Sequence, residues 1–332
     1  MSDVFSAVDS VRVDTAHSNF QDNNLIDRFS IANSYNGNLG SPIQSKLYFD
    51  RPENNGFIFS NAYYPYISQI ESTTFYNTKT PFSNLKYLTG GTNYREEDQI
   101  AFLFTANANK NLNFGTTLDY IYARGEYNNQ AVKRFSGTLF GTYKGKRYSA
   151  TGLIATNSLS NYENGGITES TYLTNPPYGY DEAQNFPIRL KDDVQSSYKH
   201  FQLFFNHQYS LGFERAIKDS KDTTATEFIP VTKFTHTLKL NDMRKRYFEN
   251  SVETAFYKNT YLPTLQTNDT AALQSLSNRF AISLAEEFNK FMQFGLTAYA
   301  DNEIERFTYA QDTLVFNQLE SNTKIGAILS KE

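Results

Sequence analysis

Four histidines are the residues of this chain best suited to metal or acid–base chemistry: His17, His200, His207 and His236. A metal site needs several converging ligands, and a helical site places two of them a few residues apart on one face. No two of these histidines have that spacing, and His207 and His236 fall at apolar positions of alternating segments. We therefore predict no metal and no cofactor at the histidines.

Catalytic and phosphate-binding motifs do not emerge from the sequence either. Serine is plentiful, but nothing marks one serine as a nucleophile beside a histidine and an acid. No glycine-rich phosphate loop of either common kind occurs. The carboxylates of Asp181, Glu182, Asp192 and Asp193 offer oxygen ligands for Ca²⁺, yet their spacing is not that of a calcium loop, which favours a solvated loop. We predict that the protein is not an enzyme.

The clearest spacing in the chain belongs to a segment that begins at Leu112. Its apolar positions are Leu112, Phe114, Leu118 and Tyr120, and its intervening positions are Asn113, Gly115, Thr117 and Asp119. Because successive side chains of a strand point to opposite faces, this segment has one apolar and one polar face. The pattern returns in segments of about ten residues, which is the signal of a transmembrane β-barrel.

The composition agrees with an all-β protein rich in aromatic side chains. The 332 residues include 24 Tyr and 28 Phe although only 39% are hydrophobic. Aromatic girdles of a membrane barrel account for that excess, while a soluble β-sandwich, which also favours Tyr, Phe and Thr, is the alternative. The absence of cysteine fits an oxidising compartment.

Charge and hydropathy exclude two further classes of protein. The net charge is −4 and there is no basic stripe, so nucleic acid is not an expected partner. The longest apolar run, Ile100–Phe104, is too short for a membrane helix. Closed strands need no such run, since they use only alternate side chains for lipid.

The alternating segments predict ten antiparallel strands, an even number that suits a bacterial barrel. They lie near residues 85–94, 99–108, 112–124, 135–143, 148–154, 201–211, 227–240, 276–288, 292–304 and 321–329. Short turns at Asn109–Asn111 and Lys144–Lys146 alternate with longer polar connections such as Gly125–Val132, and Phe288–Phe291 resembles the short turns. Outer-membrane barrels have short periplasmic turns and long outer loops, so strand 112–124 is predicted to run outward.

The first 80 residues differ from the rest of the chain. Turn clusters at Gly37–Pro42 and Asp50–Gly56 enclose runs that are too short and too rich in proline to span a bilayer. We predict a non-spanning N-terminal region over residues 1–80, either periplasmic or folded into the lumen. Barrel strands are predicted over 81–332, with long outer loops at 161–197 and 241–275. The run Tyr63–Tyr66 could stack on sugars, but we interpret it as packing that anchors this region.

The polar positions of the strands are the candidate pore lining. They are Asn113, Asp119, Thr138, Arg147, Gln202, Asn206, Lys233, Lys239, Gln293 and Asp301. Rings of such groups set the ion preference of a pore, and because both signs of charge occur here we predict weak selectivity.

The two ends of the chain differ from those of a complete outer-membrane precursor. Met1–Val4 does not begin a signal peptide. Leu329–Glu332 lacks the aromatic residue that usually ends a bacterial barrel. We expect the chain to be the N-terminal portion of a longer barrel.

Several strings, in their order and spacing, resemble the putative porin family of Bacteroidota outer membranes. They are Gly37–Pro42, Tyr48–Pro52, Phe75–Phe82, Leu112–Gly115, Gly145–Tyr148 and Glu163–Gly166. The resemblance runs from about Asn36 to the end of the chain. It implies a porin-like barrel of the cell outer membrane, with no particular solute and no catalytic residues. Members of the family are longer and carry a signal peptide.

Three functions follow from these expectations. The first is a porin-like barrel that passes small hydrophilic solutes by diffusion, with outer-membrane lipid as its surroundings and a second copy or accessory outer-membrane proteins as further partners. The second is a structural or ligand-binding barrel closed by the N-terminal region. The third is a soluble β-sandwich that binds carbohydrate.

Overall fold

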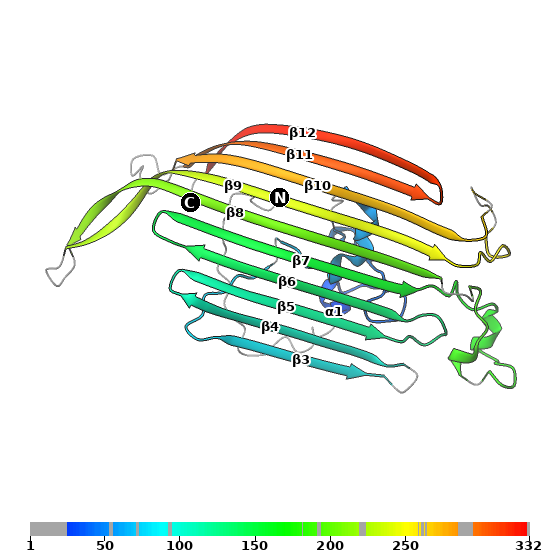
Figure 1. Ribbon diagram of the computed structural model, residues 1–332. Helices are drawn as coiled ribbons and strands as arrows, with labels where there is room; N and C mark the ends of the chain where they lie inside the picture. Colours follow the sequence, from blue (N-terminus) through cyan, green and yellow to red (C-terminus); the bar gives the residue numbers. More distant parts are fainter. Residues whose placement is uncertain are drawn as a thin grey trace.

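A single antiparallel sheet dominates the computed structural model (Figure 1). The structure describes residues 25–52, 56–70, 73–91, 95–180, 182–190, 194–218, 224–257, 259, 262, 264–284 and 295–330. Ten strands follow one another in sequence order, each hydrogen-bonded to the next, from β3 at one edge to β12 at the other. The predicted all-β fold with ten antiparallel strands is confirmed.

The strands are mostly longer than the alternating segments predicted. They are β3 (Phe82–Gly90), β4 (Glu97–Asn109), β5 (Leu112–Ala123), β6 (Val132–Lys144), β7 (Tyr148–Tyr162), β8 (Gln195–Lys218), β9 (Thr224–Glu249), β10 (Thr267–Leu284), β11 (Gly295–Gln311) and β12 (Leu314–Ser330). Each of the ten predicted segments corresponds to one of these strands.

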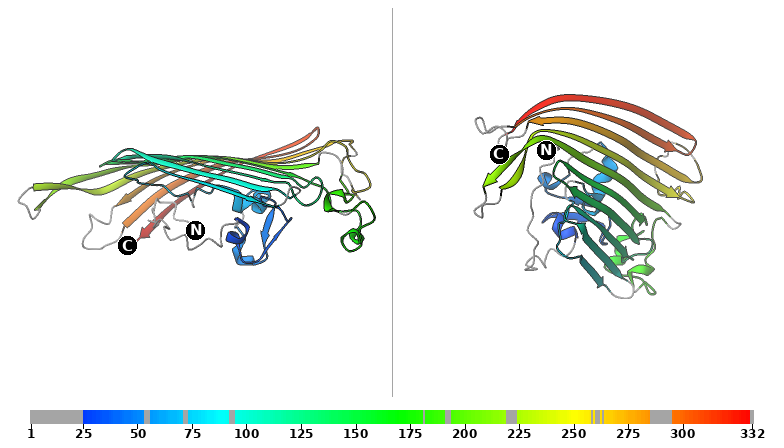
Figure 2. Two further views of the ribbon diagram at one scale, coloured as in Figure 1. Left: turned by 90° about the horizontal axis from the view of Figure 1, so that it is seen from below. Right: turned by 60° about the vertical axis from the view of Figure 1, so that its left-hand side comes forward.

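The sheet curves strongly, so it has a concave and a convex face (Figure 2). Residues that pair across adjacent strands lie on the same face of the sheet. Asp119 of β5 pairs with Ser136 of β6, which pairs with Asn157 of β7. Among the described residues, β3 pairs with β4 alone and β12 with β11 alone, so the sheet is open between these two edges.

The turns and loops agree with the sequence at one end of the sheet and differ at the other. The short turns after β4 and β6 are confirmed. The loop predicted over 161–197 is limited to 163–194, and the one over 241–275 to 250–266, because their outer parts are paired strand. The interval between the predicted segments 292–304 and 321–329 is mostly paired strand, and β11 and β12 are joined by the tight turn Asp312–Thr313, where Asp312 has a φ of 49°. The predicted turn Phe288–Phe291 lies outside the described residues.

β8 and β9 form a long ribbon that extends beyond both neighbouring strands (Figure 1). A bulge at Leu211/Gly212 interrupts their register where the ribbon leaves the sheet. A Cβ on Gly212 would lie 1.9 Å from the carbonyl oxygen of Ile229, so this bulge needs a glycine.

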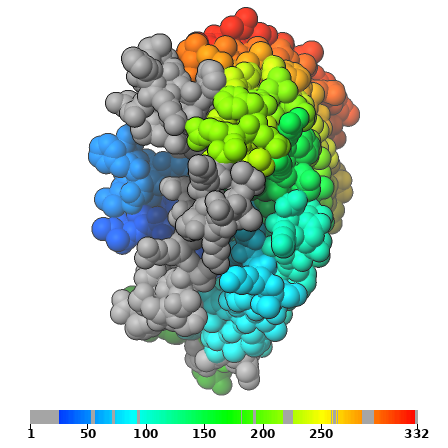
Figure 3. Space-filling model, turned by 90° about the vertical axis from the view of Figure 1, so that its left-hand side faces the viewer, coloured from blue at the N-terminus to red at the C-terminus, as the bar shows by residue number. Residues whose placement is uncertain are grey.

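The described residues between 25 and 80, here called the N-terminal segment, lie on the concave face (Figures 2 and 3). The segment contains α1 (Leu25–Phe29), the two-stranded sheet of β1 (Asn33–Tyr35) and β2 (Ile43–Ser45), and the 3₁₀ helices η2 (Tyr48–Asp50) and η3 (Ile58–Tyr66). Two more 3₁₀ helices, η4 (Ser170–Leu173) and η5 (Ala183–Asn185), lie in the connection between β7 and β8.

The main apolar core lies between the N-terminal segment and the sheet. It joins Ile26, Ile43, Phe57, Tyr63, Tyr66 and Ile67 of the segment to Leu159, Tyr198, Met243 and Leu273 of four strands. Tyr63 stacks on Tyr198 with ring centroids 5.5 Å apart. The aromatic run therefore packs against the sheet, as interpreted from the sequence.

No helix among the described residues has the length and apolar character needed to cross a membrane.

Candidate functional site: the concave face

The two faces of the sheet carry different side chains. On the convex face, Leu112, Phe114, Leu118 and Tyr120 are each 37–47% exposed, and the apolar side chains of β6 on this face are 38–59% exposed. On the concave face many of the intervening side chains are polar, while Leu159, Tyr198, Met243 and Leu273 form the apolar core with the N-terminal segment. The alternation read from the sequence thus separates an apolar surface from a polar one.

The predicted pore-lining residues that the structure describes in strands share the concave face. They are Asn113, Asp119, Thr138, Gln202, Asn206, Lys233, Lys239 and Asp301. Arg147 lies in the turn before β7, with its guanidinium 5.4 Å from the ring centroid of Phe228. Gln293 lies outside the described residues. Their role as a pore lining stays a prediction.

Several of these side chains are buried and bonded to their neighbours. Asn113, Thr138 and Gln202 are each 4% exposed. The amide of Asn113 donates to Asn107 Oδ1 at 2.6 Å, and the amide of Asn206 donates to Thr237 Oγ1 at 2.7 Å. The polar wall is therefore a connected network in which most groups already have a partner.

Arg134 joins the sheet to the N-terminal segment. Its Nε and Nη2 donate to the backbone oxygen of Tyr66 at 3.0 and 2.6 Å, and its Nη1 donates to Asp119 Oδ1 at 3.1 Å. The side chain of Asp119 also accepts from Gln99 Nε2 at 3.0 Å. A guanidinium has donors in a fixed fork, which suits it to this double attachment.

A second attachment is made by hydroxyl and amide groups. Ser68 of the segment lies with its Oγ 2.9 Å from Ser136 Oγ, and its backbone N–H donates to Asn157 Oδ1 at 3.2 Å. Thr138 Oγ1 donates to Ser68 Oγ at 3.3 Å. These neutral contacts hold the segment after η3 close to the middle of the sheet.

A third attachment lies near the long connections. Lys245 Nζ donates to Tyr63 OH at 2.7 Å and also contacts Ser196 Oγ. Glu163, in the connection that follows β7, is half-buried beside this lysine. Burial raises the pKa of the Glu163 carboxyl above its ordinary value, while the Lys245 ammonium and a hydrogen bond from Ser196 act in the opposite direction.

The concave face also pairs its own charges. Arg279 Nη2 lies 2.5 Å from Asp301 Oδ2, and Ser277 Oγ donates to Asp301 Oδ1 at 3.2 Å. Lys324 lies 3.9 Å from Glu303 on the last two strands. Opposite charges on adjacent strands largely cancel on this wall.

Phe140 and Phe204 are aromatic residues on the concave face, and each is covered there. Phe140 packs against Phe75 and Tyr76 of the N-terminal segment, with centroids 5.9 and 5.8 Å apart. Phe204 lies beneath the ammonium of Lys239, 5.9 Å from the ring centroid. Each aromatic ring replaces a polar group at a position where it is covered.

A hollow of about 270 Å³ remains between the segment and the sheet. Its wall includes hydroxyl groups of Ser68, Thr117 and Thr138 and the rings of Tyr76 and Phe140. This lining carries no charged side chain and combines hydroxyl groups with aromatic rings, which suits a small uncharged polar molecule.

His200, His207 and His236, the histidines that the structure describes, form no metal cluster. Across the described residues, no group of three or more His, Asp or Glu side chains could hold a metal ion. His207 lies 3.1 Å from His236 on the convex face, and His236 stacks on Phe280. Of the acidic residues considered for Ca²⁺, Glu182 lies exposed beside η5. Asp181, Asp192 and Asp193, like His17, lie outside the described residues.

The sequence reading missed the residues that hold the segment in place. Arg134 and Asn157 have the parity of the polar face, and this parity is the one signal that could have identified them. Their partners Tyr66 and Ser68 lie 68 and 89 residues earlier in the chain. No local sequence pattern predicts contacts between residues so far apart in the chain.

Comparison with known proteins gives one match. A family described as "Putative porin" matches residues 3–332. No curated protein and no solved structure matches the chain.

Proposed function

The chain belongs to the putative porin family, and from this premise we propose that it forms part of an outer-membrane channel wall along which small hydrophilic solutes diffuse. In this role the convex face contacts membrane lipid and the concave face borders the aqueous path. The protein performs no catalytic step.

The main support for the proposal is that exposed apolar side chains lie on one face of the sheet and polar ones on the other. Exposed apolar side chains such as Phe114, Leu139 and Phe234 follow the convex face across the sheet. A soluble protein rarely exposes so extended an apolar surface. Contact with lipid removes these apolar side chains from water, since a membrane barrel directs apolar side chains outward and polar ones inward.

Charge pairing on the concave face supports weak selectivity between anions and cations. Asp119 is paired with Arg134, and Asp301 with Arg279. A paired wall presents hydrogen-bonding groups to a solute without a strong field of either sign. We therefore propose neutral or weakly charged polar solutes.

The N-terminal segment supports a second candidate, a barrel that this segment closes. Its contacts at Tyr66, Ser68 and Tyr63 hold it against the concave face. A segment held in this way would obstruct a path along the sheet until it moved.

A soluble β-sandwich is the weakest of the three functions. A sandwich needs a second sheet packed on the apolar face of the first. Among the described residues, the only other sheet is the pair β1 and β2, which lies on the opposite, concave face.

Reconstitution of the purified protein in planar bilayers tests the channel. We expect stepwise conductance with a reversal potential near zero in a potassium chloride gradient, because selectivity is weak. Bilayers that stay silent at high protein load would contradict the proposal. Gel migration that changes on heating, together with dependence on detergent, separates either barrel from a soluble sandwich.

A reversible disulfide between the N-terminal segment and the sheet distinguishes an open channel from a barrel that the segment closes. The Oγ atoms of Ser68 and Ser136 are 2.9 Å apart, close enough for a Ser68→Cys and Ser136→Cys pair to form a disulfide. Equal conductance before and after reduction supports a path beside a fixed segment. A rise on reduction supports closure by the segment, and the single variants control for the reductant.

A further inference from the structure

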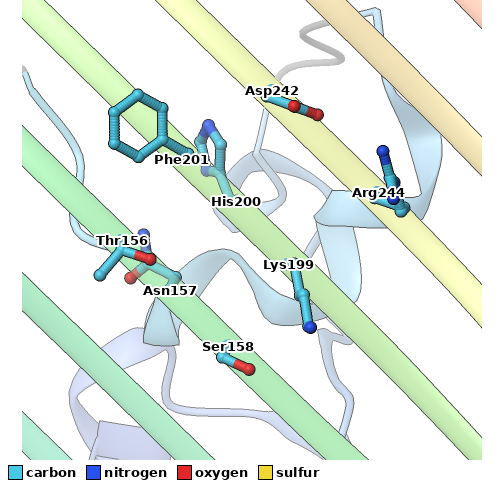
Figure 4. Close-up of a pocket in the computed structure, with 8 residues that line it drawn as sticks. All are labelled: Thr156, Asn157, Ser158, Lys199, His200, Phe201, Asp242 and Arg244. Carbon is cyan, nitrogen blue, oxygen red and sulfur yellow. The ribbon is translucent and has the colours of Figure 1, made fainter.

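A polar hollow of about 400 Å³ lies over β7, β8 and β9 where the apolar surface ends (Figure 4). Its lining on the convex face comprises Thr156, Ser158, Lys199, Phe201, Asp242 and Arg244. The register of the strands places these alternate positions on the same face as Leu203 and Leu240. The hollow is therefore separate from the concave wall.

Two exposed cations lie side by side in this hollow. Lys199 and Arg244 are direct cross-strand partners, and Ser158 is the partner of Lys199 on the other side. Like charges in directly opposed positions repel unless an anion lies between them. Among the residues that the structure describes, no ion pair neutralises either cation.

The nearby carboxylate of Asp242 offsets only part of this charge. Asp242 Oδ2 accepts a hydrogen bond from Gln274 Nε2 of β10 at 3.2 Å, so this oxygen is engaged on the side away from β8. Arg246, two residues further along β9, is exposed and adds a third cation. The local charge on this part of the convex face is positive.

The apolar surface begins directly beside the hollow. Phe201 is 40% exposed and lies next along β8 from Lys199 on the same face. From Leu240 the apolar positions of β9 continue to Phe234, a distance of roughly 20 Å along a strand. An amphipathic molecule could place an anionic head in the hollow and its chains on this surface.

We propose that the hollow binds the phosphate group of an anionic bilayer lipid, with its acyl chains against the apolar convex face. Lysine, arginine and serine are the donors that phosphate oxygens accept. The adjoining apolar surface favours a lipid over free phosphate. The inference rests on the proposed membrane-embedded function, because only that function brings lipid to this face.

Native mass spectrometry of the detergent-solubilised protein tests the site with phosphatidylglycerol as the probe. We expect the protein to retain phosphatidylglycerol in preference to phosphatidylcholine. Replacement of both cations (Lys199→Gln with Arg244→Gln) should weaken phosphatidylglycerol binding about twenty-five-fold, since each surface cation contributes about fivefold.

A matched variant removes two charges elsewhere. Lys46 and Arg189 are exposed and lie in the N-terminal segment and in the connection before β8. The pair Lys46→Gln with Arg189→Gln should leave lipid binding unchanged. Heat-dependent gel migration shows whether each variant is folded.

Three results would overturn the proposal: equal lipid retention by the double variant, equal loss in the matched control, or displacement of the lipid by equimolar inorganic phosphate. Conductance of the same preparations is measured separately. A folded, conducting protein that shows no preference for phosphatidylglycerol refutes the lipid site alone, whereas a protein that neither inserts nor conducts refutes the proposed function.

Discussion

Arg134 donates two hydrogen bonds to the backbone oxygen of Tyr66, at 3.0 and 2.6 Å, across a separation of 68 residues. The guanidinium also lies 5.3 Å from the centre of the Tyr66 ring. A backbone acceptor is present whatever side chain occupies position 66, so the arginine recognises the path of the chain at the end of η3. This contact fixes the N-terminal segment to the wall that the proposed solute path follows.

Replacement of Arg134 should therefore both destabilise the protein and loosen the segment. The side chain is 6% exposed, and Arg134→Met would leave Asp119 without its ion-pair partner. Breaking a buried pair from one side costs about 3 kcal/mol. Urea unfolding in detergent measures the change, and limited proteolysis should cut the segment faster.

Lys324 supplies the control for this experiment. Its ion pair with Glu303 is exposed and 3.9 Å long. Lys324→Met should cost less than about 1 kcal/mol and leave the proteolysis of the segment unchanged. Equal effects of the two substitutions would show that Arg134 is an ordinary surface charge.

Phe140 and Leu139 are adjacent residues whose substitution should have different effects on the segment. Phe140 is 5% exposed under Phe75 and Tyr76, whereas Leu139 is 59% exposed on the convex face. Phe140→Ala should cost about 3–5 kcal/mol and expose residues 73–80 to protease. Leu139→Ala should leave the cleavage rate unchanged. Faster cleavage in both variants would contradict the assignment of faces.

The raised pKa of Glu163 predicts a pH dependence of stability. Because the folded state holds this proton more tightly than the unfolded state, the stability contribution falls as pH rises through the raised pKa. Glu163→Gln, which stays neutral, should lose this dependence and be the more stable form at pH 7. The difference between the two unfolding curves from pH 4 to 8 measures it. A variant that is less stable than the native protein at pH 7 would contradict the prediction.

The sequence predicted the strands well where apolar and polar positions alternate, as they do from Leu112 to Tyr120 apart from Thr116. It underestimated β8 and β9 because their outer ends carry charged side chains on the convex face and apolar ones, such as Tyr198 and Met243, on the concave face. At Lys199 and Arg244 the convex face is charged, so the two-residue period of hydrophobicity disappears although the hydrogen-bonded ladder continues. Periodicity reports burial or lipid contact, and it does not report pairing itself.

The concave face could be predicted only in outline. Parity identified Asn113, Asp119 and Thr138 as polar-face residues, and the register places them there. The sequence did not predict the contacts of this face. The roles of Phe140 and Arg134 are clear only in the folded protein, where the N-terminal segment covers them. Contacts over such separations depend on the fold as a whole.

The central claim is that one face of the sheet meets lipid and the other borders water, and neighbouring single cysteines test it most directly. The chain has no cysteine of its own. Leu118→Cys and Phe234→Cys place a fluorophore on the convex face, while Thr117→Cys and Thr235→Cys place it on the concave face. In vesicles of lipids with brominated acyl chains, we expect strong quenching at positions 118 and 234 and little at 117 and 235. Equal quenching at neighbouring positions, or the reverse order, would contradict the claim.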